Sequence, residues 1–145
     1  MVQDIDRISG DVVDVAIRLH RELGPGLLES VYETVLAAKL ARMGYRVETQ
    51  VPVAIRFEDM RFDNAFRIDL LVEGRLIVEI KSVERPTAAH AKQLLTYLRL
   101  TDRRVGLLIN FGGATLKEGI RRLVNNHDTS ASPHLCANNQ SDLQE

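Results

Sequence analysis

Apolar residues recur at helical spacing in the first quarter of the chain. Residues 5–22 place isoleucine, valine and leucine side chains three or four positions apart, which predicts an amphipathic helix. The Gly-Pro-Gly sequence at 24–26 predicts where this helix ends. A second periodic stretch, about 28–43, predicts another helix that stops at Gly44.

The middle of the chain changes to an alternating pattern, which predicts strands. Residues 45–58 alternate apolar and polar positions, 59–64 form a polar turn, and two apolar runs on either side of Gly74 predict a β-hairpin. The remaining expected elements are a helix over about 86–100, a buried strand over 104–110 and a last helix over about 114–124. The order ααβββαβα predicts an α/β fold with a mixed sheet and helices on its faces.

The pattern predicts one folded domain, residues 1–124, followed by a polar tail. A chain of 145 residues can bury a single core. From residue 125 onward asparagine, serine and aspartate dominate, so we expect 125–145 to be disordered. No apolar run approaches the roughly 18 residues of a membrane span, and the first residues lack the features of a signal peptide. We therefore expect a cytoplasmic protein with no membrane partner.

Charge is distributed unevenly along the chain. Residues 1–74 carry 9 Lys and Arg against 13 Asp and Glu, whereas residues 75–122 carry 10 against 4. A basic half can contact phosphate groups, although a solvated surface on an ordinary enzyme explains the same charge equally well. The single cysteine, Cys136, excludes an intramolecular disulfide, and the four histidines do not have zinc-ligand spacing.

Charged residues interrupt both apolar strands of the predicted hairpin. Glu79 and Lys81 are two positions apart in the run 76–83, so their side chains share one face of a strand. Asp69 occupies a similar place in the preceding strand. Charged groups are rarely buried unless they are paired or bind a metal. Two acids and a lysine on adjacent strands suit a hard divalent cation and a water that it activates.

The length of the hairpin loop decides whether Asp69 and Glu79 share a face. A two-residue loop sends their side chains to opposite faces of the sheet. A three-residue loop over 72–74, with Gly74 in the left-handed conformation, restores a common face. This register places Asp69 opposite Ile77, with Glu79 on the diagonal about 7–8 Å away. The proposed chemistry therefore requires an odd loop, and the glycine permits one.

The candidate residues also have ordinary structural explanations. Glu79 and Lys81 could form an ion pair on an exposed edge strand, although the apolar residues on their face argue against it. Glu29 heads an apolar row on the second helix, and from that pattern alone the stabilisation of a helix N-terminus is favoured. Gln93 and Tyr97 share a face of the next helix, where they contact either a substrate or only solvent.

Taken together, these motifs resemble the small bacterial and archaeal GxxExxY proteins, a group within the PD-(D/E)xK nuclease superfamily. The resemblance covers about residues 5–123, and its segments are 26–32, which has the form G-x-x-E-x-x-Y, then Asp69, 79–81, 93–98 and 106–111. It implies a restriction-endonuclease-like core, with a central mixed sheet flanked by helices. The site would lie on the second and third strands.

The resemblance also implies roles for the charged residues. Asp69, Glu79 and the main-chain carbonyl of Ile80 would ligate Mg²⁺ or Mn²⁺, and Glu29 would add a carboxylate from its helix. Lys81 would orient the attacking water and stabilise the charge that develops on the phosphate.

Gln93 and Tyr97 match a Q-x-x-x-Y element of exonuclease-like branches, which implies a substrate-binding or site-supporting role. Ile68 departs from the family motif, which has proline before the aspartate, and this change is common and tolerated. The expected activity is metal-dependent hydrolysis of phosphodiester bonds in DNA or RNA. The alternative is a non-catalytic nucleic-acid-binding or assembly module on the same fold. The short chain favours a homodimer or a larger complex.

Overall fold

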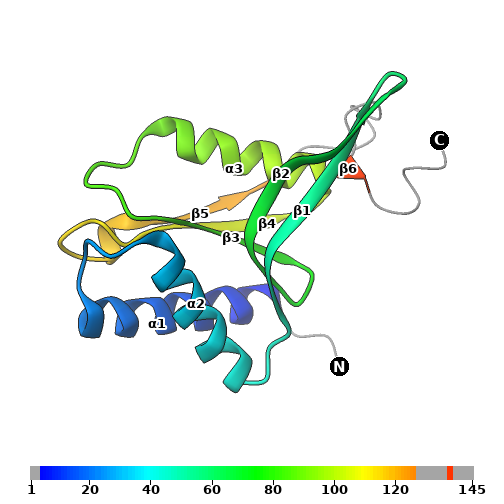
Figure 1. Ribbon diagram of the computed structural model, residues 1–145. Helices are drawn as coiled ribbons and strands as arrows, with labels where there is room; N and C mark the ends of the chain where they lie inside the picture. Colours follow the sequence, from blue (N-terminus) through cyan, green and yellow to red (C-terminus); the bar gives the residue numbers. More distant parts are fainter. Residues whose placement is uncertain (1–3, 127–136, 139–145) are drawn as a thin grey trace.

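A computed structural model describes residues 4–126 and 137–138, which form a mixed sheet between helices (Figure 1). The sheet has six strands in the order β5-β4-β3-β2-β1-β6. The elements are α1 (Ile5–Leu23), α2 (Glu29–Arg42), β1 (Val47–Phe57), β2 (Met60–Val72), β3 (Leu76–Lys81), α3 (Ala88–Leu100), β4 (Val105–Asn110), η1 (Lys117–Gly119), β5 (Ile120–Val124) and β6 (Ala137–Asn138).

The sheet separates two apolar cores. Helices α1 and α2 cover one face and α3 covers the other (Figure 1). Alternation along β3 supplies both cores, because Val78 and Ile80 pack with α1 and α2 while Ile77 packs with α3. Strands β3 and β4 are parallel and lie in the middle of the sheet, where both faces are covered. The predicted α/β fold with a central mixed sheet is therefore confirmed.

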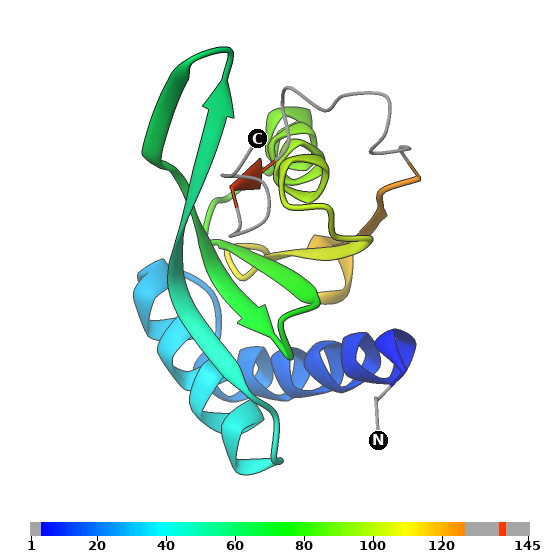
Figure 2. The ribbon, with the colours of Figure 1, turned by 90° about the vertical axis from the view of Figure 1, so that its right-hand side faces the viewer.

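Strands β1 and β2 continue beyond the sheet as a projecting hairpin (Figures 1 and 2). The predicted polar turn over 59–64 is wrong, because β2 already begins at Met60. The chain reverses just before that residue, with Glu58 in the left-handed conformation at φ 56°. Ile55 lies opposite Phe62, and this cross-strand pair favours a ribbon over a loop in an otherwise polar segment.

The last predicted helix, 114–124, is also wrong. This segment forms the short 3₁₀ turn η1 and then strand β5, which pairs antiparallel with β4. A Cβ added to Gly119 would lie 2.5 Å from the carbonyl oxygen of Asn110, so this close approach requires glycine. Strand β5 also pairs main-chain groups of β4 that a helix would leave unpaired. The element order in the described core is therefore ααβββαββ.

Most of the predicted tail, 125–145, lies outside the described residues. Asn125 belongs to the folded part, since its main-chain N–H donates to the carbonyl of Arg104 and its side-chain amide donates to the carbonyl of Arg103. Ala137–Asn138 form the two-residue strand β6, which pairs with β1. The predicted domain boundary at 124 and the disorder expected for 125–145 both stay predictions.

Candidate metal centre

The hairpin of β2 and β3 places Asp69 and Glu79 on a common face, as the sequence predicted. The last paired residues of the two strands are Leu70 and Val78, and one further step along the same register puts Asp69 opposite Glu79. The predicted position of Asp69 opposite Ile77 is wrong. The regular pairing of the two strands ends at Leu70 and Val78, and beyond it each carboxyl group accepts a hydrogen bond from the main chain of the other strand, which keeps Asp69 and Glu79 close together.

The hairpin loop explains this difference in register. The loop has three residues, as predicted, but it spans 73–75 rather than 72–74. Glu73 and Gly74 both adopt the left-handed conformation, with φ values of 55° and 65°. Arg46 holds Glu73 there, since its main-chain N–H donates to Oε2 of Glu73 (2.6 Å) and its carbonyl accepts the N–H of Glu73 (2.8 Å). These bonds compensate for the unfavourable φ of a glutamate.

Side chains replace the main-chain ladder where β2 and β3 separate. The main-chain N–H of Asp69 donates to Oε2 of Glu79 (3.0 Å), and the N–H of Ile80 donates to Oδ2 of Asp69 (2.9 Å). Each carboxyl group is thus anchored to the opposite strand by a hydrogen bond from a main-chain N–H. Within the described part of the chain, neither acid forms a hydrogen bond or salt bridge with a basic side chain.

Glu79 is an acid in an unfavourable environment. Its side chain lies in the centre of the sheet, and the residue is only 4% exposed. Burial, and then repulsion from Asp69, raise the pKa of Glu79 to about 8, although the Asp69 N–H and the charge of Lys81 oppose this shift. Near neutral pH Glu79 therefore holds a proton unless a cation takes the place of that proton.

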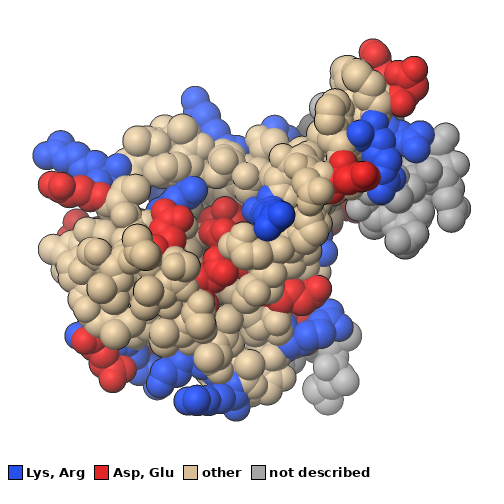
Figure 3. All heavy atoms as spheres, in the orientation of Figure 1, with Lys and Arg blue, Asp and Glu red and all other residues tan. Residues whose placement is uncertain are grey.

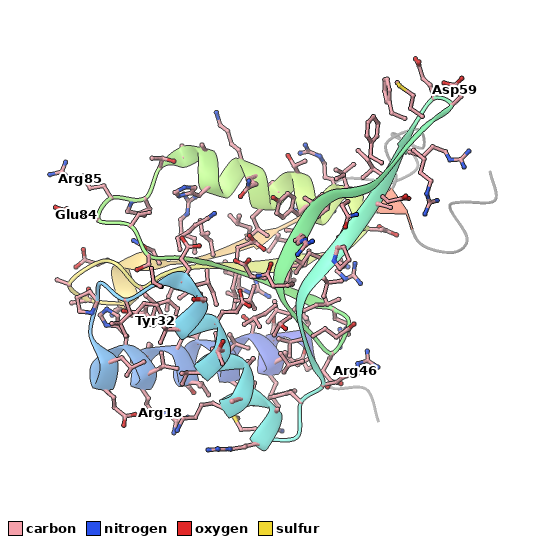
Figure 4. The ribbon with its side chains drawn as sticks, viewed as in Figure 1. Arg18, Tyr32, Arg46, Asp59, Glu84 and Arg85 are labelled. Atoms are coloured by element: carbon pink, nitrogen blue, oxygen red, sulfur yellow. The ribbon has the colours of Figure 1, made fainter. Side chains whose placement is uncertain are left out.

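Glu29 is positioned by the loop that precedes α2. The buried hydroxyl of Tyr32 donates to the carbonyl of Gly24 (2.5 Å) and accepts the N–H of Leu27 (3.1 Å). The Tyr32 ring, labelled in Figure 4, stacks on Phe111 with centroids 4.3 Å apart. The glycine-rich turn is thereby fastened to the start of α2. The tyrosine of the G-x-x-E-x-x-Y motif thus orients the segment that carries its glutamate.

The side chain of Glu29 lies at the rim of the site rather than beside the other two acids. It is exposed, and its Oε2 accepts the main-chain N–H of Ser82 at 3.3 Å. The hydroxyl of Ser82 donates to the carbonyl of Leu27 (2.7 Å), which ties the start of α2 to the end of β3. Glu29 thus contacts Ser82, the residue that follows Lys81. It has no hydrogen bond to Asp69 or Glu79 among the described contacts.

Two polar residues of the site, Glu33 and Gln50, were not predicted from the sequence. The side-chain amide of Gln50 donates to Oε1 of Glu33 (2.7 Å) and to Oδ1 of Asp69 (3.2 Å), so it bridges α2 and β2. Burial, with repulsion from Asp69 and Glu29, raises the pKa of Glu33, while the Gln50 hydrogen bond opposes this shift. The i, i+4 spacing of Glu29 and Glu33 was a usable signal, because it places two carboxylates on one helix face.

Lys81 ends the buried part of β3 and is half-buried. Its carbonyl accepts the N–H of Phe111 (2.8 Å), which anchors it to β4. Among the described residues Lys81 forms no salt bridge with Glu79, and β3 is a central strand. The alternative of an ion pair on an exposed edge strand is therefore wrong. The ammonium group instead acts on Glu79 through its charge, which lowers the pKa of that acid.

Tyr97 faces the two acids from α3, whereas Gln93 stays at the surface. The ring of Tyr97 stacks on Phe66 of β2 at 4.0 Å, with planes 8° apart. Burial, followed by the charges of Glu79 and Asp69, raises the pKa of Tyr97, so its hydroxyl stays protonated. Gln93 is exposed one helical turn earlier and has no hydrogen bond among the described contacts. Tyr97 thus borders the site, whereas Gln93 lies one helical turn further out and is exposed to solvent.

The paired acids fit a hard divalent cation only in part. Figure 3 shows carboxylates gathered over the middle of the molecule, between α2 and α3. Within residues 4–126 and 137–138, however, no three His, Cys, Asp or Glu side chains lie close enough together to hold a metal ion. Asp69 and Glu79 alone offer two oxygen ligands, and Mg²⁺ commonly binds one or two carboxylates while keeping several waters. Two carboxylates with room for water beside them are thus compatible with a hard divalent cation, but they do not form a complete protein ligand set.

A mixed sheet between helices, with two acids where its central strands separate, defines a restriction-endonuclease-like α/β protein. The family model of the PD-(D/E)XK nuclease superfamily matches residues 6–123, so the chain belongs to that superfamily. No curated protein and no solved structure matches the chain. In the part of the chain that the structure describes, no helix is long and apolar enough to cross a membrane.

Proposed function

We propose that the protein is a metal-dependent nuclease of the GxxExxY type that hydrolyses phosphodiester bonds in DNA or RNA. The observation that carries this proposal is the pair Asp69 and Glu79. A buried acid whose pKa is about 8, next to a second acid and without an ion pair, gains most from a bound cation. Superfamily membership supplies the substrate class, since it implies a nucleic acid.

Asp69 and Glu79 would hold Mg²⁺ or Mn²⁺, with the carbonyl of Ile80 beside them. When bound, the ion supplies positive charge that polarises a phosphate oxygen and acidifies a water molecule. Lys81 follows Glu79 on the same face, so its ammonium orients that water and stabilises charge on the phosphate. Glu29 accepts the N–H of Ser82 at the rim, and we assign it to the outer side of the site, where water links it to the ion.

Tyr97 and Gln93 would support the substrate from α3. The protonated hydroxyl of Tyr97 can donate to a phosphate oxygen near the acids, and its ring is held by Phe66. Gln93 lies one turn further out, where its amide can contact the nucleic acid that leaves the site. Both roles concern binding of the substrate, and neither residue takes part in proton transfer.

The test is a cleavage assay with pure protein and end-labelled single- and double-stranded DNA and RNA. Each substrate is incubated with Mg²⁺, with Mn²⁺ or with EDTA. Cleavage with either metal that EDTA abolishes, and that Asp69→Asn also abolishes, supports the proposal. Equal cleavage by Asp69→Asn would indicate a contaminating nuclease. Nucleic-acid binding without cleavage under any condition would favour the non-catalytic binding or assembly module.

We further propose that the protein acts in the cytoplasm and assembles as a homodimer or within a larger complex. The described core has little surface beyond the sheet and its three helices with which to read a sequence, so recognition of a particular substrate would require a partner. Sedimentation of the protein alone and with an oligonucleotide measures whether a second copy is recruited.

A further inference from the structure

A second charged hollow lies at the opposite end of β3 from Lys81. It has a volume of about 630 Å³, and its charged lining consists of Arg75, Arg103, Arg104, Arg122, Asp6 and Asp102. The arginines come from the β2–β3 loop, the turn between α3 and β4, and strand β5. Figure 2 looks onto this end of the molecule, where these segments lie around the start of α1.

The positive charge of this hollow exceeds the negative charge around it. Arg122 is paired with Asp6 at 2.5 Å. Arg103 donates to main-chain carbonyls, with Nε on Gly74 (3.0 Å), rather than to a carboxylate. Arg104 is exposed, and its side chain has no hydrogen bond or salt bridge among the described residues. The lining thus holds four guanidinium groups and two aspartates, Glu48 adds a negative charge near Arg103, and Arg104 is left without a carboxylate partner among the described residues.

The hollow is built before any ligand arrives. Arg103 is largely buried, and burial lowers its pKa although the charges of Glu48 and Asp102 oppose this shift. Its Nε bond to Gly74 fastens the α3–β4 turn to the β2–β3 loop. Asn125 fastens the same turn from the other side, through its bonds to the carbonyls of Arg103 and Arg104. These hydrogen bonds fix the main chain next to the exposed guanidinium of Arg104, which suits a site that binds an anion without rearrangement.

We propose that this hollow binds phosphate groups. Arginine is the side chain best suited to phosphate, because its planar guanidinium donates two parallel hydrogen bonds to phosphate oxygens. Arg104 contacts the anion, and Arg103 joins the turn that carries Arg104 to the β2–β3 loop. The hollow is separate from the metal centre, and the inference does not depend on the proposed nuclease activity. The phosphate belongs either to the backbone of a nucleic acid or to a free phosphate compound.

The test compares two exposed arginines at opposite ends of the molecule. Arg104→Glu removes a lining residue, and Arg85→Glu makes the same charge change beyond the far end of β3, where Figure 4 labels Arg85. Binding of a fluorescent single-stranded oligonucleotide is measured by anisotropy in EDTA, which prevents metal-dependent cleavage. Loss of one charge-assisted contact weakens binding about tenfold, so we expect this loss for Arg104→Glu. For Arg85→Glu we expect a change of less than about twofold.

Salt titration and competition complete the test. The slope of log affinity against log salt should fall by about 0.7 for Arg104→Glu, as one single-strand phosphate contact is lost. Pyrophosphate that displaces the oligonucleotide from the wild type but not from Arg104→Glu would identify a free phosphate compound as the ligand, and failure to displace it would identify the nucleic-acid backbone. Equal weakening by both variants, or no binding of either probe to the wild type, would overturn the proposal. Melting temperatures of both variants check that they fold.

Discussion

The two ends of the β2–β3 hairpin carry opposite charge. At the open end Asp69 and Glu79 lie side by side, and Glu79 is buried. At the loop end Arg75 and Arg103 line a hollow with further arginines. Glu79 is four residues from Arg75, about 13 Å along a strand, so the two groups neutralise each other little through water. The comparison teaches that each end has an excess charge which a ligand of opposite sign can neutralise.

The ends differ in how the protein accommodates that excess. The arginine end neutralises part of its charge internally, through the carbonyl of Gly74 and through Asp6. The acidic end has main-chain N–H donors, the side-chain amide of Gln50 and the nearby charge of Lys81, but burial and repulsion from Asp69 still raise the pKa of Glu79 to about 8. The acidic end should therefore respond to a cation more strongly than the arginine end responds to an anion.

The largest effect is expected for Lys81→Ala, which removes the positive group of the acidic end. If Lys81 stabilises charge on the phosphate, cleavage should fall by at least about 100-fold, as when one transition-state donor is removed. Lys81 forms no salt bridge among the described residues, so the melting temperature should be unchanged or slightly higher.

Arg85→Ala is the matched control for this variant. Arg85 is exposed, lies four residues beyond Lys81 and loses the same unit of charge. It should retain cleavage within a factor of about two, since an exposed single charge contributes little. A lysine variant that loses several degrees of melting temperature but keeps full activity would contradict the catalytic assignment.

Glu79→Gln is expected to change the dependence of stability on pH. The raised pKa keeps a proton on Glu79 in the folded protein up to pH about 8, whereas the unfolded chain releases it near 4.5, the ordinary pKa of a glutamate. Since the folded state binds more protons in this window, stability falls as pH rises from about 5 to 8. Glutamine cannot ionise, so the variant should lose this fall and be more stable than the wild type at pH 8. Denaturant unfolding at several pH values measures it.

Binding of Mn²⁺ gives a second test of Glu79, in which the substitution should weaken stabilisation by the metal rather than increase stability. The cation should raise the melting temperature of the wild type, because it binds the folded state and relieves the repulsion between the acids. Glu79→Gln loses one charged ligand, so the increase should be smaller although the metal-free variant is more stable. Calorimetric titration supplies the affinities, and equal affinity for both proteins would remove Glu79 from the ligand set.

Sequence patterns predicted the central part of the molecule well because its residues interact within one or two neighbouring elements. The common face of Asp69 and Glu79 follows from strand alternation and from the glycine in the loop. Strand β5 could not be predicted in this way, since its pairing depends on the free edge of β4 and on the contact between Gly119 and Asn110. That information lies in tertiary contacts rather than in local periodicity.

The residues of the site also divide into those that local sequence patterns predict and those that depend on tertiary contacts. The motif residues could be found by spacing, but Gln50 could not, because its left-handed conformation has no sequence signal and its partners come from α2 and β2. The arginine hollow could not be predicted from the sequence either, although residues 75–122 carry an excess of basic residues. Composition indicates how much charge is present, whereas the convergence of two loops and strand β5 determines where the arginines gather.

Arg103→Ala is expected to destabilise the loop end by about 1.5–3 kcal/mol, as when a hydrogen bond to a charged group is removed from a largely buried site. The reason is the loss of the Nε bond to Gly74, which joins two loops. Urea unfolding measures the change in the free energy of unfolding. Arg104→Ala is the control and should be neutral, because its side chain is exposed. Equal effects from the two variants would show that Arg103 does not hold the loops together.

The smallest effect is expected for Gln50→Gly, which separates backbone strain from side-chain bridging at the acidic end. Gln50 has φ 51°, a conformation that favours glycine, so the substitution should stabilise the main chain by about 1 kcal/mol. It also removes the amide between Glu33 and Asp69, and losing two hydrogen bonds costs a similar amount. The free energy of unfolding should therefore change by less than about 1 kcal/mol.

Gln50→Asn serves as the control, because asparagine tolerates the left-handed conformation but its side chain is one methylene shorter. If the bridge matters for the site, both variants should bind Mn²⁺ differently from the wild type, although their stability is nearly unchanged. Without the amide, Glu33 and Asp69 repel each other more, so their affinity for the cation should rise while cleavage falls through the loss of alignment. Unchanged metal affinity in both variants would show that Gln50 only joins α2 to the sheet, and that the acidic end does not extend beyond Asp69 and Glu79.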